Sequence, residues 1–455
     1  MPYSEDVAKS LKLEKFIMND FVEDERGLFA VQTFSIDKKE LKEDADAMTT
    51  YMSEELAAMI LAYGRELAEK QAGGLVRETV ITVPSHWNQE KRRMLNDAAE
   101  LAGLSVIQLV HENAAAAIMY GIDRLDTEKS INVLIYNMGG RDTEVSVVQY
   151  SAVTDAKNKT FEHVEVLGEG VDETLGGHEF DHVVVRILAD KFNSLKERQG
   201  KPDIRQNDRA MKRLYKEALN IKDILSANRV VNVKIPELAD YVTLAFELTR
   251  ETFEHECASL FERVKAPITQ ALTEAGLSSG DIDQIEILGG AIRVPKVQAI
   301  LREALDDQEL HVHLNGDEAM SFGSAFIAAN SSTSFKVRKV YLTQHPKYDI
   351  RVKVAPLNPE AVDPSQTSQD KNGDEEDEDD SITYEKETVL YKRSDYLGQK
   401  KTIHLFYDVD MKIEATAIYP DGSEEELVSY QLNMTKVMDK EVMKREKITK
   451  PKMSL

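Results

Sequence analysis

Cysteine, basic charge and long apolar runs are all scarce in this chain. Its 455 residues include one cysteine, Cys257, which excludes a disulfide framework and a cysteine metal cluster. The formal charge of −24 argues against nucleic acid as the main partner, because phosphate backbones are bound by basic surfaces. No apolar run approaches the roughly 20 residues that span a bilayer. The first residues lack a signal peptide and the last lack a retention signal, which by itself predicts a soluble, cytoplasmic chain.

The first third of the chain alternates between strand and helix patterns. Residues 78–87 form a strand ended by Pro84, 88–104 a helix that opens on Asn88, and 105–121 a strand, a turn and an alanine-rich helix. Residues 49–71 have helical spacing with Ser53 as the expected N-cap. The apolar face of that helix consists of Met52, Leu56, Met59, Ile60, Tyr63 and Leu67. This alternation predicts an α/β domain.

A second α/β region follows from residue 167. We expect long helices over 205–230 and 249–276, and a strand, a glycine turn and a helix over 282–305. Residues 316–330 form a helix of small residues that is able to pack very close to a neighbour. The length of the chain implies roughly two or three domains.

After residue 333 the apolar residues alternate with a period of two, which predicts an antiparallel β-domain. We divide the chain into a nucleotide-binding domain over 1–332 and a β-sandwich over 333–433. The run DKNGDEEDEDD lies in a solvated acidic loop over 358–383 of that sandwich, because like charges repel and resist burial. A basic tail covers 434–455.

The stretch VLIYNMGGRDTEVSVV (133–148) reads as two strands pinched around glycines. Glycine lets backbone N–H groups approach anionic oxygens closely, so such a turn is able to hold a phosphate. Taken singly, a glycine pair is usually structural. Three pairs in one α/β chain are better explained by convergence on one anionic ligand. These pairs are Gly139–Gly140, Gly176–Gly177 and Gly289–Gly290. Arg293, just after the third pair, suits stacking on a purine.

Several segments together resemble the heat-shock seventy-kilodalton chaperone family, and the resemblance covers nearly the whole chain. They occur in the family's order, and the acidic loop and FERVKAPITQAL suggest its large endoplasmic-reticulum branch. The segments are ETVITVPSHWNQEKRRMLNDAAELAGLSVIQLVHENAAAAIMYG, TLGGHEFD, LSAN, LGGAIRVPKVQ and NGDEAMSFGSAFIAA. The resemblance implies an actin-like, two-lobed ATPase domain followed by a β-sandwich.

By the resemblance, ATP or ADP is held between the lobes, with Mg²⁺ if the first lobe is complete. Glu112 matches a carboxylate near the metal and water, and Pro84 matches a hinge proline. The positions that match nucleotide contacts are Gly139, Gly140, Gly176, Gly177, Lys222, Ser226, Gly289, Gly290, Arg293 and Asp317.

The chain departs from the family at positions that matter for chemistry. Asn137 stands where the second phosphate loop has an acid, and Asp142 stands where it has a threonine. An amide is no base, and Asp142 adds negative charge where phosphate would lie. His178, Leu219 and Asp223 also replace family residues.

The family's first phosphate loop and catalytic lysine have no counterpart, and no helical lid follows residue 455. We therefore expect a fragment of a longer protein, with a degenerate form as the alternative, and negligible ATP hydrolysis. We assign no catalytic residue and no metal ligand, since His111, His163, His178 and His255 lack metal spacing.

Three functions stay open. The first is an ATP-binding chaperone of the large branch, which holds unfolded polypeptides and acts as nucleotide exchange factor for a smaller relative in the endoplasmic-reticulum lumen. The second is a nucleotide-free polypeptide-binding module with a vestigial ATPase scaffold, in which the β-domain adds a peptide strand. The third and least favoured is a sugar-kinase-like phosphotransferase, which needs a carboxylate base and a complete phosphate clamp.

Overall fold

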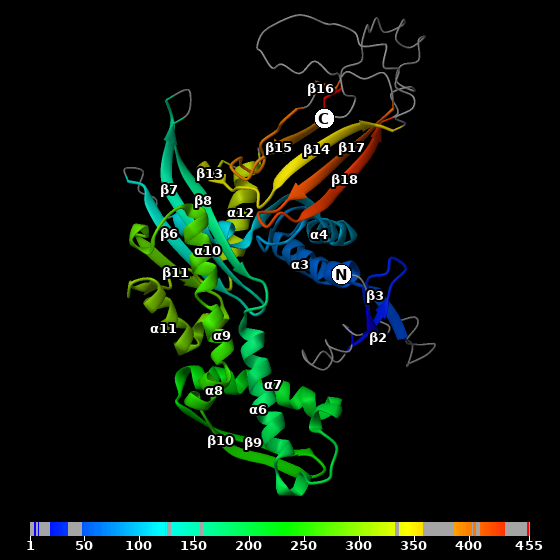
Figure 1. Cartoon of the computed structure of the whole chain (residues 1–455), viewed down its shortest axis with the longest axis vertical. Helices are drawn as coiled ribbons and strands as arrows, with labels where there is room; N and C mark the ends of the chain where they lie inside the picture. The colour runs from blue at the N-terminus through cyan, green and yellow to red at the C-terminus, as the bar shows by residue number, and fades with distance from the viewer. Residues whose placement is uncertain are drawn as a thin grey trace, which may run out of the picture. The chain divides into compact units, whose positions relative to one another are not determined.

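The computed structural model describes most of the chain (Figure 1). The described residues are 4, 5, 8, 19–34, 48–122, 124, 129–154, 158–332, 336–357, 386–402, 404–405, 410–432 and 453–454. The chain divides into two compact units, Met1–Leu342 and Thr343–Leu455. None of the helices in the described part is long and apolar enough to cross a membrane.

A six-stranded sheet forms the centre of the first unit, in the order β12-β11-β6-β7-β8-β13. The expected glycine hairpin is confirmed, because β6 (Ile131–Met138) and β7 (Thr143–Thr154) pair antiparallel around it. β7 pairs antiparallel with β8 (Thr160–Asp172), and β11 (Gln284–Leu288) runs parallel to β6. The edge strands are β12 (Leu310–His311) and β13 (Val340–Thr343).

Successive residues of β6 face opposite sides of the sheet, so each side has its own core. Leu134 and Tyr136 pack with α6 (Gly177–Asn193), α10 (Ala266–Ala275) and α11 (Pro295–Ala304). Val133 and Ile135 pack with α5 (Glu112–Gly121) and α12 (Ala319–Ser331). Figure 1 shows α10 alongside β8. The sheet is therefore buried on both faces by helices.

The small-residue helix packs as closely as its composition predicts. A Cβ atom on Gly323 of α12 would lie 1.8 Å from the backbone oxygen of Ala115 on α5. On the other face, a Cβ atom on Gly170 of β8 would lie 1.9 Å from the backbone oxygen of Pro267. No side chain larger than hydrogen fits at either contact, so these glycines set the distance between the helices and their neighbours.

The region after α6 differs from the expectation. α7 (Asp208–Ala227) is one helix, and it is followed by an unanticipated hairpin of β9 (Val230–Ala239) and β10 (Val242–Thr249). The long helix predicted over 249–276 is wrong. That segment is divided into α8 (Arg250–Glu256), α9 (Ala258–Arg263) and α10. The first break falls at Cys257, whose backbone leaves the helical region at φ −92° and ψ 6°. The second falls at Val264 and Lys265, just before α10, in whose first turn Pro267 fits because it has no N–H to donate.

Short 3₁₀ turns connect several of these elements. They are η1 (Lys196–Arg198), η2 (Ile204–Gln206), η3 (Ser279–Asp281) and η4 (Gly290–Arg293).

The N-terminal part has a three-stranded antiparallel sheet and a parallel pair. The sheet consists of β1 (Asp20–Glu23), β2 (Phe29–Phe34) and β3 (Met48–Met52), and the pair of β4 (Glu78–Val83) and β5 (Ser105–His111). α3 (Ser53–Ala72) follows β3, and α4 (Gln89–Leu101) joins the parallel strands. The side chain of Asn88 caps α4, accepting from the N–H of Lys91 at 3.1 Å, as predicted. The N-cap of α3 is Met52 rather than Ser53, and the N–H of Met52 donates to Glu55 at 2.8 Å.

The apolar face predicted for α3 is exposed. Ile60 is 74% and Tyr63 63% exposed, whereas Ala58 of the same helix is buried. α3 packs on α4 through alanines, with Ala58 in one cluster with Ala98 and Ala102. Small side chains allow the two helix backbones to approach, so α4 covers the alanine face of α3. The larger apolar residues lie on the other face of α3.

In the second unit, β15 (Lys386–Tyr391), β14 (Asp349–Pro356), β17 (Met411–Ile418) and β18 (Glu424–Leu432) form an antiparallel sheet in that order. Val352, Val354, Met411 and Ile413 form its core. β16 (His404–Leu405) pairs with β19 (Met453–Ser454). The sheet confirms the antiparallel texture, and the β-sandwich stays a prediction. The predicted loop over 358–383 lies outside the described residues, as does the tail over 434–455 except for β19.

The division between the two units falls between Leu342 and Thr343, within β13 (Val340–Thr343), which hydrogen-bonds to β8 in the central sheet. The domain boundary that the sequence suggests between residues 332 and 333 stays a prediction.

Candidate functional site

The three glycine turns meet at one place in the first unit. The N–H of Gly177, at the start of α6, donates to the backbone oxygen of Gly139 at 2.9 Å. The next N–H, of His178, donates to the oxygen of Gly140 at 2.7 Å. The hairpin turn between β6 and β7 is thereby joined to the N-terminus of α6, which carries a partial positive charge.

Two of the glycines are required by close backbone contacts. Gly289 follows β11 with φ +86°, and a Cβ atom there would lie 2.2 Å from the oxygen of Met138. A Cβ atom on Gly176 would lie 2.5 Å from the backbone carbon of Arg141. The third turn therefore touches the first turn, as does the second, which is the convergence that the sequence predicts.

Lys222 of α7 reaches this point from the side. Its Nζ lies 2.7 Å from Asp181, a buried carboxylate on α6, and donates to the oxygen of Gly177 at 3.3 Å. Ser226, one turn further along α7, donates to the backbone oxygen of Lys222 at 3.0 Å. Leu219 and Asp223, which replace family residues, are exposed on the same helix. The ammonium group is therefore fixed beside the second glycine turn.

Gly290, Arg293 and Asp317 lie on the open side of the cluster. No heavy atom lies within 4 Å of a Cβ atom built on Gly290, and Arg293 is exposed at the end of η4. A Cβ atom on Gly316 would lie 3.3 Å from the N atom of Gly289. This contact brings the loop that carries the exposed Asp317 to the same place. The positions to which the resemblance assigns adenosine contacts are therefore accessible to solvent.

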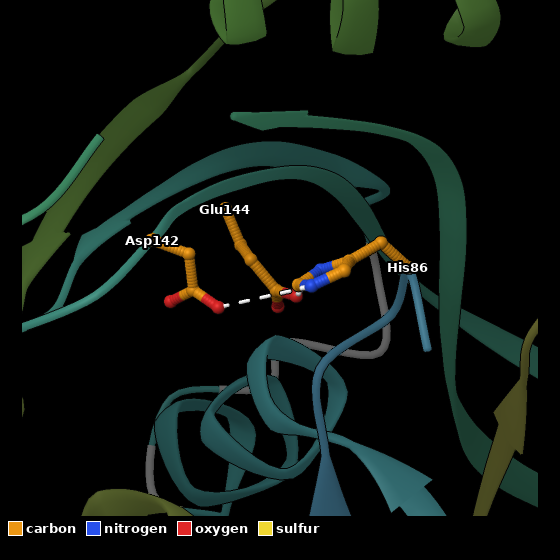
Figure 2. A group of neighbouring side chains, drawn as sticks. All are labelled: His86, Asp142 and Glu144. Carbon is orange, nitrogen blue, oxygen red and sulfur yellow. Dashed lines mark hydrogen bonds and ion pairs between the residues drawn. The ribbon is translucent and has the colours of Figure 1, made fainter. Parts of the chain in front are cut away.

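Asp142, which stands where the family has a threonine, lies in an acidic cluster with a histidine. Asn137 is buried and pairs with Glu144 across β6 and β7. Nδ1 of His86 lies 3.3 Å from Oε1 of Glu144, and Nε2 of His86 lies 4.0 Å from Oδ2 of Asp142. Figure 2 shows these three side chains pointing toward one another. The loop that contributes two of the glycines therefore also contributes two carboxylates.

The carboxylates change the protonation of a nearby acid. Burial is the largest cause, and the charges of Glu144 and Asp142 add to it, so that the pKa of Glu112, the first residue of α5, is raised from 4.5 to about 7; His86 acts in the opposite direction. Burial, followed by the charge of Glu144, also raises the pKa of Asp142. This end of the site therefore has a strong negative potential, which favours protons or cations.

The sequence patterns did not indicate that His86, Asp181 and Glu144 belong to this site. His86 follows Pro84 closely but stands 56 positions before Asp142 in the chain, so no local spacing pairs them. They meet because β4 ends beside the start of β7, where the N–H of Ser85 donates to Glu144 at 2.7 Å. Only the fold supplies this contact.

Comparisons with known proteins agree with this architecture. The family model described as Hsp70 protein matches residues 14–437. Hypoxia up-regulated protein 1 of Xenopus laevis is 41% identical over 305 residues, which are 67% of this chain and 47% of that protein. The Xenopus tropicalis protein of the same name is 37% identical over 356 residues (78% and 53%), and the human one 37% identical over 323 residues (70% and 32%).

The chain belongs to the Hsp70 family, whose ATPase domain has an actin-like, two-lobed α/β fold. It spans roughly a third to a half of the length of the curated relatives named above.

Proposed function

We propose that the first unit binds ATP or ADP where the three glycine turns meet. The observation that carries this proposal is the joining of Gly139, Gly177 and Gly289 through backbone contacts from three separate elements. The positive N-terminal end of α6, with the ammonium group of Lys222 beside it, suits phosphate oxygens. The open space at Gly290 and the exposed Arg293 suit a purine.

The same site argues for nucleotide bound together with a divalent cation. Asp142 and Glu144 lie in the loop that would hold phosphate, and their charges repel a bare triphosphate. Mg²⁺ binds carboxylates together with phosphates and so offsets that repulsion. The ligand oxygens of Asp142 and Glu144 lie close enough together to share such an ion with the phosphates, and Glu112, which the resemblance assigns to the metal or water, lies near them.

The test is the binding of a fluorescent ADP analogue with Mg²⁺, with Arg293→Ala compared with Arg302→Ala. Both arginines are exposed, and Arg302 lies on the neighbouring helix α11. Loss of a stacking guanidinium should weaken binding about tenfold in Arg293→Ala and leave the Arg302→Ala variant unchanged. An intact protein that binds no nucleotide would contradict the proposal.

We further propose that hydrolysis by this chain is negligible. Asn137 is buried at the end of β6, where an amide is able to donate or accept a hydrogen bond but is unable to accept a proton from water. Phosphate release should therefore stay at background with ATP and Mg²⁺. Release above background that disappears in a Gly139→Asp variant would overturn this proposal.

For the whole protein, we propose a chaperone of the large endoplasmic-reticulum branch. Membership of the Hsp70 family and the similarity to proteins named hypoxia up-regulated protein 1 support it. In this proposal the second unit holds unfolded polypeptides, and the nucleotide-bound first unit acts as exchange factor for a smaller chaperone of the family in the endoplasmic-reticulum lumen. Trapping of an unfolded reporter and accelerated ADP release from a small Hsp70 would test the two roles separately.

The carboxylate of Asp142, in the turn between β6 and β7, favours a second candidate, a polypeptide-binding module on a vestigial ATPase scaffold. A half-buried carboxylate at Asp142 is unfavourable beside phosphate, and the antiparallel sheet has edge strands β15 and β18 that offer backbone groups to an extended peptide. Peptide binding that is retained, with no heat on titration with ATP and Mg²⁺, would favour this candidate over the first.

A further inference from the structure

His86, Asp142 and Glu144 bring three metal-ligating side chains together from two separate segments. One ligand atom of each residue lies within 4.8 Å of the ligand atoms of the other two (Figure 2). His86 belongs to the turn after β4, whereas Asp142 and Glu144 flank the start of β7. A four-coordinate metal ion with ligands at about 2.0–2.2 Å draws its ligand atoms to roughly 3.3 Å from one another. Side-chain rotation covers the remaining distance.

One oxygen of Glu144 is unsatisfied, which points to a missing ligand. Oε1 of Glu144 accepts from the N–H of Ser85 at 2.7 Å and from its hydroxyl at 3.3 Å. Oε2 of the same carboxylate is buried and has no hydrogen-bond partner, and Glu144 as a whole is 2% exposed. A buried carboxylate oxygen without a partner is unfavourable unless a cation binds it.

The turn that carries His86 is held in place. Nε of Arg92, on α4, donates to the backbone oxygen of Trp87 at 2.8 Å, and its Nη2 donates to that of Ser85 at 3.2 Å. These two carbonyls flank His86 on either side. The imidazole therefore starts from a fixed backbone, which lowers the entropic cost of ordering it around an ion.

We propose that His86, Asp142 and Glu144 bind one divalent first-row transition-metal ion of the Zn²⁺ type, without nucleotide. A neutral imidazole nitrogen with two carboxylates is a ligand set typical of Zn²⁺, whereas Mg²⁺ and Ca²⁺ prefer oxygen ligands alone. Two carboxylates also balance the charge of the ion. The exposed Glu173 has Oε2 4.0 Å from Nε2 of His86, so this carboxylate or a water molecule completes four ligands.

The test is a titration of the metal-free protein with Zn²⁺ against a chromophoric chelator, in the absence of nucleotide. We expect one Zn²⁺ ion per chain, and at least about tenfold weaker binding in His86→Asn and in Glu144→Gln, since each removes a ligand. His255→Asn is the matched control, because His255 is 86% exposed on α8 beside Glu256 and tests adventitious imidazole binding. That variant should bind Zn²⁺ as the unmodified protein does.

A second measurement on the unmodified protein covers variants that fail to fold. Co²⁺ should give visible absorption bands typical of four-coordinate nitrogen and oxygen ligands, and Zn²⁺ should abolish them. The proposal is overturned if Zn²⁺ fails to bind, if His86→Asn binds it unchanged, or if Mg²⁺ displaces it at similar concentration. Since no nucleotide is present, the outcome is independent of whether the glycine site binds ATP.

Discussion

The central sheet of the first unit and the N-terminal helix α3 differ in how far their apolar side chains are buried. Successive residues of β6 are buried on both faces of the sheet, with Leu134 and Ile135 fully enclosed. In α3, by contrast, Ile60 and Tyr63 are mostly exposed although they share a helical face. The same kind of pattern therefore predicts which residues lie on one face but leaves open what covers that face.

Backbone distance explains part of the difference. Around the central sheet, glycines let helices approach until backbone meets backbone, as at Gly323 and Ala115. Between α3 and α4 the contact is made by alanines, Ala58 against Ala98, and Gly64 of α3 has open space around it. Small residues thus form the contacting face in both regions, but the large apolar residues are buried only around the central sheet.

The largest expected effect is that of Gly323→Ala, which inserts a methyl group between α12 and α5. A Cβ atom there would lie 1.8 Å from the oxygen of Ala115, so the helices must separate. We expect the free energy of unfolding to fall by about 3 kcal/mol, measured by denaturant titration. A loss below about 0.5 kcal/mol would show that the two helices are not tightly packed.

Glu112→Gln should stabilise the protein in a pH-dependent manner. The pKa of Glu112 is about 7 in the folded protein against 4.5 ordinarily, so the folded state binds more protons between these values. The free energy of unfolding therefore falls as pH rises from about 4.5 to 7, and glutamine removes that loss. The expected gain is of the order of 2 kcal/mol at pH 8 and close to zero at pH 4.5.

Glu90→Gln is the matched control for this change. Glu90 also lies in the first turn of a helix, α4, but is exposed. Thermal unfolding of both variants from pH 4.5 to 8 would check the prediction. A gain for Glu112→Gln that does not change with pH would contradict the assignment of a raised pKa.

Much of the fold is predictable from the sequence because its signals are local. The strand before Pro84, the cap at Asn88 and the hairpin around Gly139 each depend on neighbours within a few residues. The break at Cys257 lacked such a signal, since nothing in the sequence around it forbids a continuous helix. The exposed face of α3 was also beyond prediction, because burial depends on elements that are distant in the chain.

The candidate site divides in the same way. The glycine pairs were found because only glycine allows close backbone approach, and the structure brings them together through Gly139, Gly177 and Gly289. The cluster of His86 with Glu144 was not predicted because the two residues are far apart in the sequence and belong to no common motif. Only the positions of β4 and β7 in the fold bring them together.

A smaller effect of opposite sign is expected for Gly64→Ala in α3. No atom lies within 4 Å of a Cβ atom built on Gly64, and the residue is exposed within the helix. Alanine lowers the conformational entropy of the unfolded chain without a clash, so unfolding should cost about 0.5–1 kcal/mol more. With Gly323→Ala, this gives one substitution with opposite outcomes in the two regions. Destabilisation by Gly64→Ala would mean that another surface covers this part of α3.

Ile60→Gln should have the smallest effect on stability, because the side chain of Ile60 is 74% exposed and little apolar area is lost from contact with protein. We expect a change within about 0.5 kcal/mol in the free energy of unfolding. Ile135→Gln, at a fully buried position of β6, is the contrasting variant and should cost several times more. If Ile60→Gln instead costs as much as a core substitution, the apolar face of α3 is covered in solution. Static light scattering at several protein concentrations would then separate self-association, in which the mass falls on dilution, from coverage within a single chain, in which it does not.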